Sequence, residues 1–316
     1  MYHIIINPAS RSGRGQQYWE IAEPYLKEQQ IPYTAYRSDH SGHIAEIAYD
    51  ITKNLDDSSD IISLIVLGGD GTVNEALQGI TRPDKVRLGY IPTGSSNDFA
   101  RDLGISKDPV EALSHMLNTP HIRRMDIGCV EYKDCREKEP LLHKRYFSVS
   151  CGLGYDAAIC EEAIHSKIKL ILNRCGLGKL TYLIIALKQL ACAKRISGTL
   201  TLHGKKDLHL HNLLFLAGMN HQYEGGGFMF APGAVDNDGI FDLCCVSNVS
   251  KLKVLCVLPT AYKGKHFRFK GVDAFHTDAY TLKVSSPMWL HTDGEIPAFT
   301  DEISVSCLHK ALQIFY

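Results

Sequence analysis

The sequence from Ile61 to Glu75 reads Ile-Ile-Ser-Leu-Ile-Val-Leu-Gly-Gly-Asp-Gly-Thr-Val-Asn-Glu. Its first half is apolar and largely β-branched, which is typical of a strand buried on both faces of a parallel sheet. The glycines that follow allow a sharp turn and a close approach of the backbone to a ligand. A helix is predicted to begin at Val73, and the free N–H groups of a helix N-terminus bind phosphate. The stretch therefore predicts an anion site at the carboxyl end of a buried strand.

Asp70 lies in the middle of this glycine turn. A carboxylate beside a polyphosphate is repelled unless a cation lies between them. Asp70 therefore indicates a Mg²⁺ site or a proton-transfer role. The alternative is structural, because Asp also caps helices and stabilises turns.

A second loop of the same kind follows the next strand. The strand ends near Ile91, and the loop continues as Pro-Thr-Gly-Ser-Ser-Asn-Asp-Phe from Pro92 to Phe99. The Asn-Asp pair is predicted to open a helix. Because the carboxyl ends of neighbouring parallel strands meet at one crevice, we expect the two acid-bearing loops to lie together.

The composition and charge of the chain limit the classes of function that it can have. The chain has 316 residues, a formal charge of -1 and ten cysteines without a Cys-x-x-Cys pair. This charge gives no reason to expect nucleic-acid binding. Apolar surroundings of the cysteines favour free thiols in a reducing compartment. No apolar run reaches the roughly 20 residues that span a bilayer, and the first residues lack the pattern of a secretory signal. We expect a cytoplasmic protein without a transmembrane segment.

The order of elements predicts two domains. Strands and helices alternate over residues 1–120, which favours a doubly wound parallel α/β domain. Strand-like segments follow one another directly over residues 121–300, which favours an antiparallel β-rich domain. Final strands within 301–316 are expected to return to the first domain. Exposed edge strands of the second domain could pair two copies into a homodimer.

Three segments leave alternatives open. The helical region 156–194 is apolar around most of its girth, so it is either buried core or a wall for a lipid chain. Three adjacent glycines at 225–227 mark a place where something approaches the backbone closely. Asp236 and Asp238 flank Asn237 in either an Asx turn or an oxygen-ligand cation site. Near the C-terminus, a predicted strand ends in a turn that carries Asp293 and Glu295.

Taken together, the motifs resemble the diacylglycerol kinase catalytic family, especially its bacterial soluble lipid kinases. In chain order they are Asn7-Pro8 with nearby glycines, Gly68-Gly69-Asp70-Gly71-Thr72 with Asn74-Glu75, Pro92 to Arg101, Gly225-Gly226-Gly227 with Ala231-Pro232 and Ala234, Asp238-Gly239 with Asp242, and Asp293-Gly294-Glu295. The Gly-x-x-Asn-Asp-Phe sequence with the later Asp-Gly-Glu is the specific part, because NAD kinases and phosphofructokinases share Gly-Gly-Asp-Gly or a close variant.

The resemblance implies transfer of the γ-phosphoryl group of ATP, with Mg²⁺, to a lipid hydroxyl such as that of diacylglycerol. A phosphofructokinase-like domain would hold ATP and a β-sandwich would carry the lipid, at a membrane surface. Glu295 would be the general base, and Asp70 and Asp98 would organise the catalytic Mg²⁺. The residues implied to line the nucleotide are Asn7, Ser38, Gly68, Gly69, Asp70, Gly71, Thr72, Val73, Asn74 and Ser95. Asp238, with the carbonyls of Val235 and Ile240, would form a structural metal site.

Two rival functions come from different classes. An NAD kinase would share the nucleotide core, but its second motif usually continues as Gly-Ser-Thr-Ala-Tyr, unlike the Gly-Ser-Ser-Asn-Asp-Phe of this chain. A non-catalytic nucleotide- or lipid-binding regulator would have no need of a base at Glu295. The Walker pattern Gly-x-x-x-x-Gly-Lys does not occur in the sequence, which excludes the P-loop route.

Overall fold

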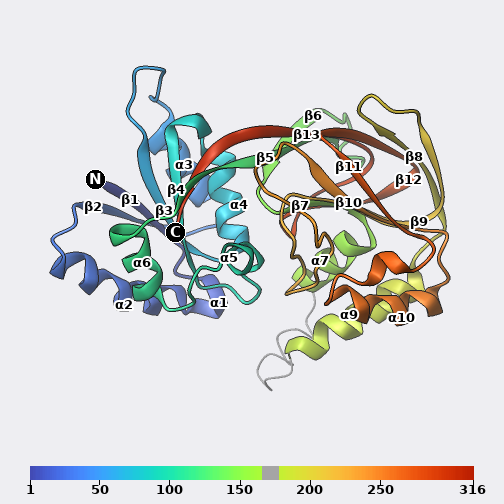
Figure 1. Ribbon diagram of the computed structural model, residues 1–316, viewed down its shortest axis with the longest axis horizontal. Coiled ribbons are helices and arrows are strands. Elements are labelled where there is room, and N and C mark those ends of the chain that lie inside the picture. The colour runs from blue at the N-terminus through green and yellow to red at the C-terminus, as the bar shows by residue number, and fades with distance from the viewer. Residues whose placement is uncertain (166–177) are drawn as a thin grey trace.

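The computed structural model describes residues 1–165 and 178–316. Figure 1 shows two lobes side by side, connected by the long strands β5 (Ile122–Lys133) and β13 (Glu295–Phe315). These two strands pair with each other in antiparallel register over much of their length. The lobes are therefore joined by continuous sheet.

The N-terminal lobe is a doubly wound parallel sheet, as predicted. Its strands lie in the order β2-β1-β3-β4, with the end of β13 parallel to β4. The strands are β1 (Tyr2–Ile6), β2 (Tyr33–Arg37), β3 (Ile62–Gly68) and β4 (Val86–Pro92). The helices are α1 (Ser10–Gly13), α2 (Gly15–Glu28), α3 (His43–Thr52), α4 (Asp70–Gly79), α5 (Asp98–Leu103) and α6 (Pro109–Asn118), with a 3₁₀ turn at Pro83–Lys85.

Helices cover both faces of this sheet. Trp19 and Leu26 of α2 pack with α6 in one core cluster, while Ile44 of α3 and Leu77 of α4 pack in the other. Leu64 of β3 is fully buried. Burial on both faces explains why β3 is an unbroken apolar run rather than an alternating one.

The C-terminal lobe is the predicted antiparallel β-sandwich. Its strands are β6 (Leu142–Phe147), β7 (Ser150–Gly154), β8 (Ile196–Leu202), β9 (Leu208–Met219), β10 (Phe241–Ser247), β11 (Val272–Thr277) and β12 (Ala279–Thr292). Its helices are α7 (Tyr155–His165), α9 (Gly178–Cys192) and α10 (Lys251–Ala261), with a 3₁₀ turn at His266–Arg268. One apolar cluster fills the sandwich, and a second lies between the sheet and the helices α9 and α10.

Several boundaries differ from the sequence-based expectation. The two final strands expected at 303–309 and 312–315 are one strand, β13, which the left-handed residue Lys310 (φ 51°) interrupts with a register shift. The helix α10 was not foreseen. In the helical region predicted over 156–194, residues 166–177 lie outside the described residues. In the parts of the chain that the structure describes, no helix is both long and apolar enough to cross a membrane. The predicted domain limits stay a prediction.

Candidate active site

The loops that follow the parallel strands meet at one edge of the N-terminal sheet. Ile6 is in register with both Arg37 and Leu67, and Gly68 is in register with Pro92. Because these strands run in the same direction, the segments that begin at positions 7, 38, 69 and 93 leave the sheet at the same edge. This edge is therefore where the residues predicted to bind nucleotide gather.

The glycine turn after β3 is held by Thr72. Its Oγ1 accepts hydrogen bonds from the N–H of Gly69 at 3.2 Å and from Nδ2 of Asn7 at 3.0 Å. A Cβ at Gly68 would collide with the Thr72 side chain. Asn7 and Thr72 thus connect the loop after β1 to the N-terminus of α4, and Gly68 leaves room for that connection.

The two glycine loops touch each other through their backbones. A Cβ placed on Gly94 would lie 2.8 Å from Cα of Gly69 and 2.6 Å from Oδ1 of Asn97. Asn97 adopts a left-handed conformation (φ 49°) and donates from Nδ2 to the Gly94 carbonyl at 3.0 Å. Glycine is therefore required at position 94 to let the loops approach.

Asp70 and Asp98 form an adjacent pair of acids. The N–H of Asp98 donates to Oδ2 of Asp70 at 3.0 Å, and the hydroxyl of Tyr90 donates to Oδ1 at 3.4 Å. Burial, together with the negative charges of Asp98 and Asp293, raises the pKa of Asp70 to about 7, although the hydrogen bond from the N–H of Asp98 opposes the shift. The site thus concentrates carboxylates where a cation would be bound favourably.

The three glycines at 225–227, which belong to the C-terminal lobe, contact Asp98 of the N-terminal lobe. The N–H of Gly226 donates to Oδ2 of Asp98 at 2.7 Å, and Arg101 donates to Oδ1 at 3.0 Å. Burial raises the pKa of Asp98, while Arg101 opposes that shift. All three glycines have positive φ, and a Cβ on Gly227 would collide with the Arg101 guanidinium. The close approach predicted for 225–227 is therefore an approach by residues of α5.

The turn between β12 and β13 is anchored by Asp293. Its Oδ1 accepts from the N–H groups of Val149 at 2.7 Å and Ser150 at 3.0 Å, and its Oδ2 accepts from the N–H of Ser148 at 2.9 Å and Nδ2 of Asn74 at 2.8 Å. Charge-assisted bonds of this kind are strong. Asp293 therefore fixes the turn against both α4 and the β6–β7 connection.

Glu295 follows directly in this fixed turn. Its Oε1 lies so close to Gly71 that a Cβ on Gly71 would overlap it. The exposed carboxylate of Glu295 thus lies against the first turn of α4, whose first residue is Asp70. The structure brings a carboxylate of the C-terminal half to the glycine turn after β3.

Comparison with known proteins matches the two lobes of the chain to two different family domains. Residues 1–130 match the diacylglycerol kinase catalytic domain, and residues 149–316, more than half of the 316, match the YegS C-terminal NAD kinase beta sandwich-like domain. The chain belongs to the diacylglycerol kinase catalytic family. It is 28% identical to a diacylglycerol kinase of Bacillus subtilis over 92% of this chain and 88% of that protein.

Other relatives agree. A diacylglycerol kinase of Mycobacterium tuberculosis is 28% identical over 80% of this chain and 76% of its own length. A solved structure of a diacylglycerol kinase from Bacillus anthracis superposes with a TM-score of 0.70 at 17% identity, covering 100% of this chain and 96% of that one. The relatives support a kinase of a lipid kinase family, and the solved structure shows a shared fold.

The family resemblance implies that ten residues line the nucleotide, and not all of them present an unengaged side chain at this edge of the sheet. Val73 is buried in the apolar core. Asn74 is fully buried, and besides Asp293 it bonds Arg145, which donates to its Oδ1 at 2.6 Å. Ser95 is exposed, and the N–H of Ser38 donates to the carbonyl of Ile6 at 3.0 Å. The nucleotide role of these four residues stays a prediction.

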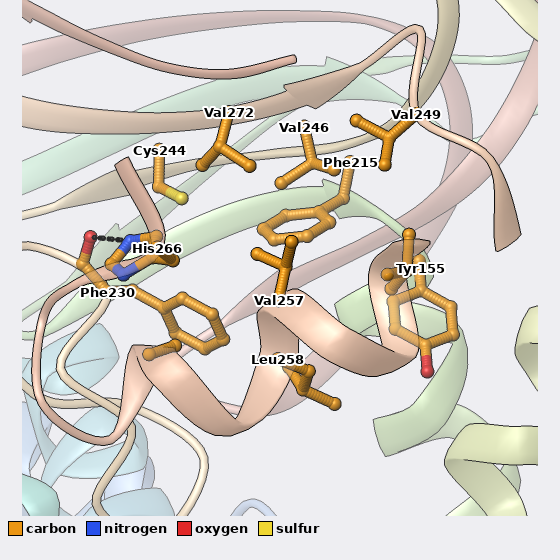
Figure 2. A pocket seen from close by; sticks show the side chains of 12 residues that line it. Tyr155, Phe215, Phe230, Cys244, Val246, Val249, Val257, Leu258, His266 and Val272 are labelled. Atoms are coloured by element: carbon orange, nitrogen blue, oxygen red, sulfur yellow. Dashed lines mark hydrogen bonds between the residues drawn. The ribbon is translucent and has the colours of Figure 1, made fainter. Parts of the chain in front are cut away.

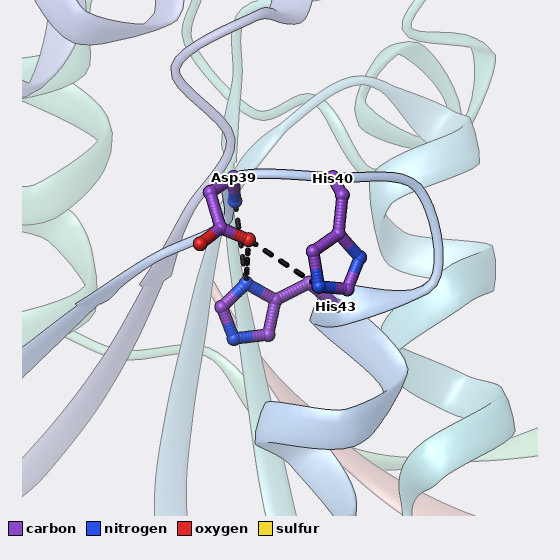
Figure 3. Close-up of side chains that lie close together, drawn as sticks. All are labelled: Asp39, His40 and His43. Carbon is purple, nitrogen blue, oxygen red and sulfur yellow. Dashed lines mark hydrogen bonds and ion pairs between the residues drawn. The ribbon is translucent and has the colours of Figure 1, made fainter.

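A small histidine cluster follows Ser38. Asp39 and His40 of the loop before α3 and His43, the first residue of α3, lie within ligand distance of one another (Figure 3). Nδ1 of His43 is 2.6 Å from Oδ1 of Asp39, and the two imidazole rings stack at 4.7 Å. Because this cluster is largely exposed and its groups pair with one another, we read it as a surface ion pair beside the nucleotide edge.

The structural metal site implied around Asp238 contains a turn closed by the Asp238 side chain and a second acid, Asp242. The N–H of Ile240 donates to Oδ1 of Asp238 at 3.0 Å, which is the Asx turn considered from the sequence. Burial raises the pKa of Asp242, with His276 opposing and Asp238 adding to the shift. Two neighbouring acids beside exposed backbone would suit an oxygen-liganded cation. The site at Val235, Asp238 and Ile240 stays a prediction.

One cluster near the active site was not foreseen. Nε2 of the buried His291 lies 3.0 Å from Oδ2 of Asp156 and 3.1 Å from Oε1 of Glu224. The N–H of Gly294 donates to the other ring nitrogen, Nδ1, at 3.4 Å. His291 therefore links two acids to the turn that carries Glu295. Its three members are far apart in the sequence and form no motif, so no local pattern marks them.

Proposed function

We propose that this protein is an ATP-dependent lipid kinase that transfers the γ-phosphoryl group to a lipid hydroxyl, with diacylglycerol as the acceptor and phosphatidic acid as the product. The position of Glu295 against Gly71 is the observation that carries the proposal. A carboxylate held against the first turn of α4, which begins with Asp70, suits phosphoryl transfer to an alcohol better than simple nucleotide binding.

The nucleotide would bind at the glycine edge. Gly69 and Gly94 expose backbone at close approach, and the N-terminus of α4 offers N–H groups and a favourable dipole to phosphate oxygens. Asn7 and Thr72 hold the neighbouring loop in place. This arrangement supports ATP as the phosphoryl donor.

The residues at Asp70 fit a divalent cation. Asp70 and Asp98 supply hard oxygen ligands, and burial is the main reason that the pKa of each is raised, so a bound cation would stabilise their charged forms. When bound there, Mg²⁺ would neutralise charge on the phosphate oxygens. We infer that Asp70 and Asp98 hold it directly or through its waters.

Glu295 would accept the proton of the acceptor hydroxyl. An alcohol becomes a better nucleophile as its proton is removed in the transition state. The turn anchored by Asp293 holds the backbone that carries Glu295, and Glu295 lies exposed at the surface of the protein. Residues 1–120 would hold ATP, residues 121–300 would carry the lipid, and 301–316 would tie the two together. The protein would act in the cytoplasm at the periphery of a membrane.

The direct test is an acceptor assay with radiolabelled ATP and Mg²⁺. Diacylglycerol in mixed micelles should yield labelled phosphatidic acid, while phosphatidylglycerol and a sphingoid base compare other lipid hydroxyls. NAD serves as the soluble control, because phosphorylation of NAD alone would favour the NAD kinase alternative. ATP binding without transfer to any of these acceptors would favour the non-catalytic regulator.

A further inference from the structure

The helices α9 and α10 have apolar side chains on both their inner and their outer faces. On the inner face, Leu190 of α9 and Val254 and Val257 of α10 are buried in one cluster with the sheet. On the outer face, large apolar side chains are 40–78% exposed. These exposed side chains, which we call the outer apolar face, are Leu183, Ile184 and Leu187 of α9 and Leu252, Leu255 and Tyr262 of α10 and its end.

The two helices lie side by side in one layer. Nζ of Lys251, the first residue of α10, donates to the carbonyl of Ala191 near the end of α9 at 2.6 Å. Figure 1 places both helices on the same side of the C-terminal lobe. The outer apolar face is therefore a surface shared by two helices, and exposed apolar side chains gathered in this way indicate a binding site.

The space beneath α10 cannot be the binding site for an acyl chain. Figure 2 shows Val257 pointing toward Phe215 of β9, with His266 and Phe230 at one end of the pocket. The pocket there has a volume of about 30 Å³. A cavity of that volume has room for about two water molecules, far less than an acyl chain needs. Any lipid at this layer must therefore meet the helices from outside.

Charge distribution identifies the partner. The segment 243–272, which contains α10, carries six Lys and Arg residues and no Asp or Glu. Lys263, Lys265, Arg268 and Lys270 are all exposed. Lys194 and Arg195, just after α9, are exposed as well. The chain as a whole has a net charge of -1, so this concentration of cations is local. Exposed apolar side chains on two helices, each followed directly by exposed cations, match an anionic lipid surface.

Aromatic contacts connect this face to the active site. Tyr262 stacks on Phe228 with ring centroids 3.9 Å apart, and Phe228 stacks on Phe230 at 5.5 Å. Phe228 directly follows the triple glycine, in which the N–H of Gly226 donates to Asp98. A surface that binds at Tyr262 is therefore linked through one short loop to a catalytic acid.

We propose that the outer apolar face and its surrounding cations dock the protein on an anionic membrane, so that a lipid acceptor leaves the bilayer beside Tyr262 and Phe228. This inference rests on the proposed lipid kinase function and adds the surface that the enzyme uses. It assigns the exposed part of the region predicted over 156–194, together with α10, to lipid contact.

The test measures binding without turnover, by co-sedimentation with vesicles of phosphatidylcholine containing 30 mol% phosphatidylglycerol (roughly the anionic fraction that gives a strong surface potential). Leu252→Glu removes an apolar contact, and binding should fall on the order of ten-fold. Lys263→Glu with Lys265→Glu should weaken binding by more than roughly five-fold for each lysine, because each change removes a positive charge and adds a negative one. The matched controls, Ile21→Glu on α2 and Lys107→Glu with Lys206→Glu, should bind as the wild type does.

Each outcome decides the proposal. Selective loss of binding in the face variants, with unchanged melting temperatures and unchanged activity on a water-soluble short-chain diacylglycerol, supports it. Binding by the face variants equal to wild type, or equal wild-type binding to vesicles with and without phosphatidylglycerol, overturns it. Failure of the kinase assay itself would appear with the soluble acceptor, so the two proposals fail separately.

Discussion

Gly71 and Glu295 lie in contact, although one belongs to α4 and the other begins β13. The carboxylate of Glu295 occupies the space that a side chain at residue 71 would fill. Glycine at position 71 is therefore a packing requirement of the active site and not a requirement of backbone conformation. The contact joins the nucleotide loop to the proposed base.

Gly71→Ala should separate folding from catalysis. The added methyl group must displace the Glu295 carboxylate, and a misplacement of about 1 Å can lower turnover about 100-fold. Alanine is favourable in a helix, so the melting temperature should not fall. Gly233→Ala is the control, because a Cβ there meets its nearest atom at an ordinary 3.7 Å. Equal kcat for wild type and Gly71→Ala would show that the contact between residue 71 and Glu295 does not affect turnover.

Asp70 should give the protein a specific pH dependence. Its pKa is raised to about 7, chiefly by burial, whereas an unfolded Asp titrates near 3.9. The folded state holds the proton more tightly, so in metal-free buffer this group makes stability fall as pH rises from about 4 to about 7. Asp70→Asn cannot titrate there.

The free energy of unfolding of Asp70→Asn relative to wild type should therefore increase across that window, by at most about 1.4 kcal/mol per pH unit. Denaturant unfolding in EDTA at pH 5 and pH 8 measures it. Added Mg²⁺ should reduce the difference in free energy of unfolding between Asp70→Asn and wild type at pH 8, because the cation stabilises the charged wild-type carboxylate. A difference that is the same at both pH values would show that Asp70 is not a strained, buried acid.

Asp293→Asn should destabilise the turn that carries Glu295. The amide replaces an oxygen that accepts from backbone N–H groups with a donor that faces them. Loss of at least one charge-assisted bond together with the new donor clash should cost on the order of 3 kcal/mol. Chemical denaturation of this variant, compared with the exposed control Asp60→Asn, gives the value. A cost below roughly 0.5 kcal/mol, typical of surface substitutions, would mean that the turn is held by other groups.

Asp238→Ala tests the second metal site. If Asp238 holds a structural cation, added Mg²⁺ should raise the melting temperature of the wild type by linkage, and the variant should lose that increment while keeping catalysis. Melting curves with EDTA and with Mg²⁺ provide the comparison. The same Mg²⁺-dependent shift in both proteins would reject the site.

The local parts of the site were predictable from the sequence. An apolar β-branched run that stops at Gly68 specifies strand, turn and helix by itself, so β3 and α4 were both found. The turn is shorter than predicted, because α4 begins at Asp70 and not at Val73. The parallel sheet followed from the alternation of elements. The positive φ values at 225–227 were likewise foreseeable from three adjacent glycines.

Long-range packing was not predictable in the same way. Nothing in the local sequence says that Arg101 approaches Gly227, that Asn74 bonds Asp293, or that His291 meets two acids. The helix α10 has a signal that was overlooked, because Ser250 caps it and Val254, Val257 and Ala261 follow at helical spacing. The interruption of β13 at Lys310 reflects a backbone conformation that lysine rarely adopts.

The central claim is that Glu295 accepts the proton of the acceptor hydroxyl, and Glu295→Gln tests it most directly. The amide keeps the shape of the side chain and its place against Gly71 but cannot act as a base. With ATP, Mg²⁺ and diacylglycerol, under conditions in which chemistry limits the rate, kcat should fall on the order of 10²–10⁴-fold while ATP binding stays near the wild-type value. A kcat within a few-fold of wild type would contradict the account.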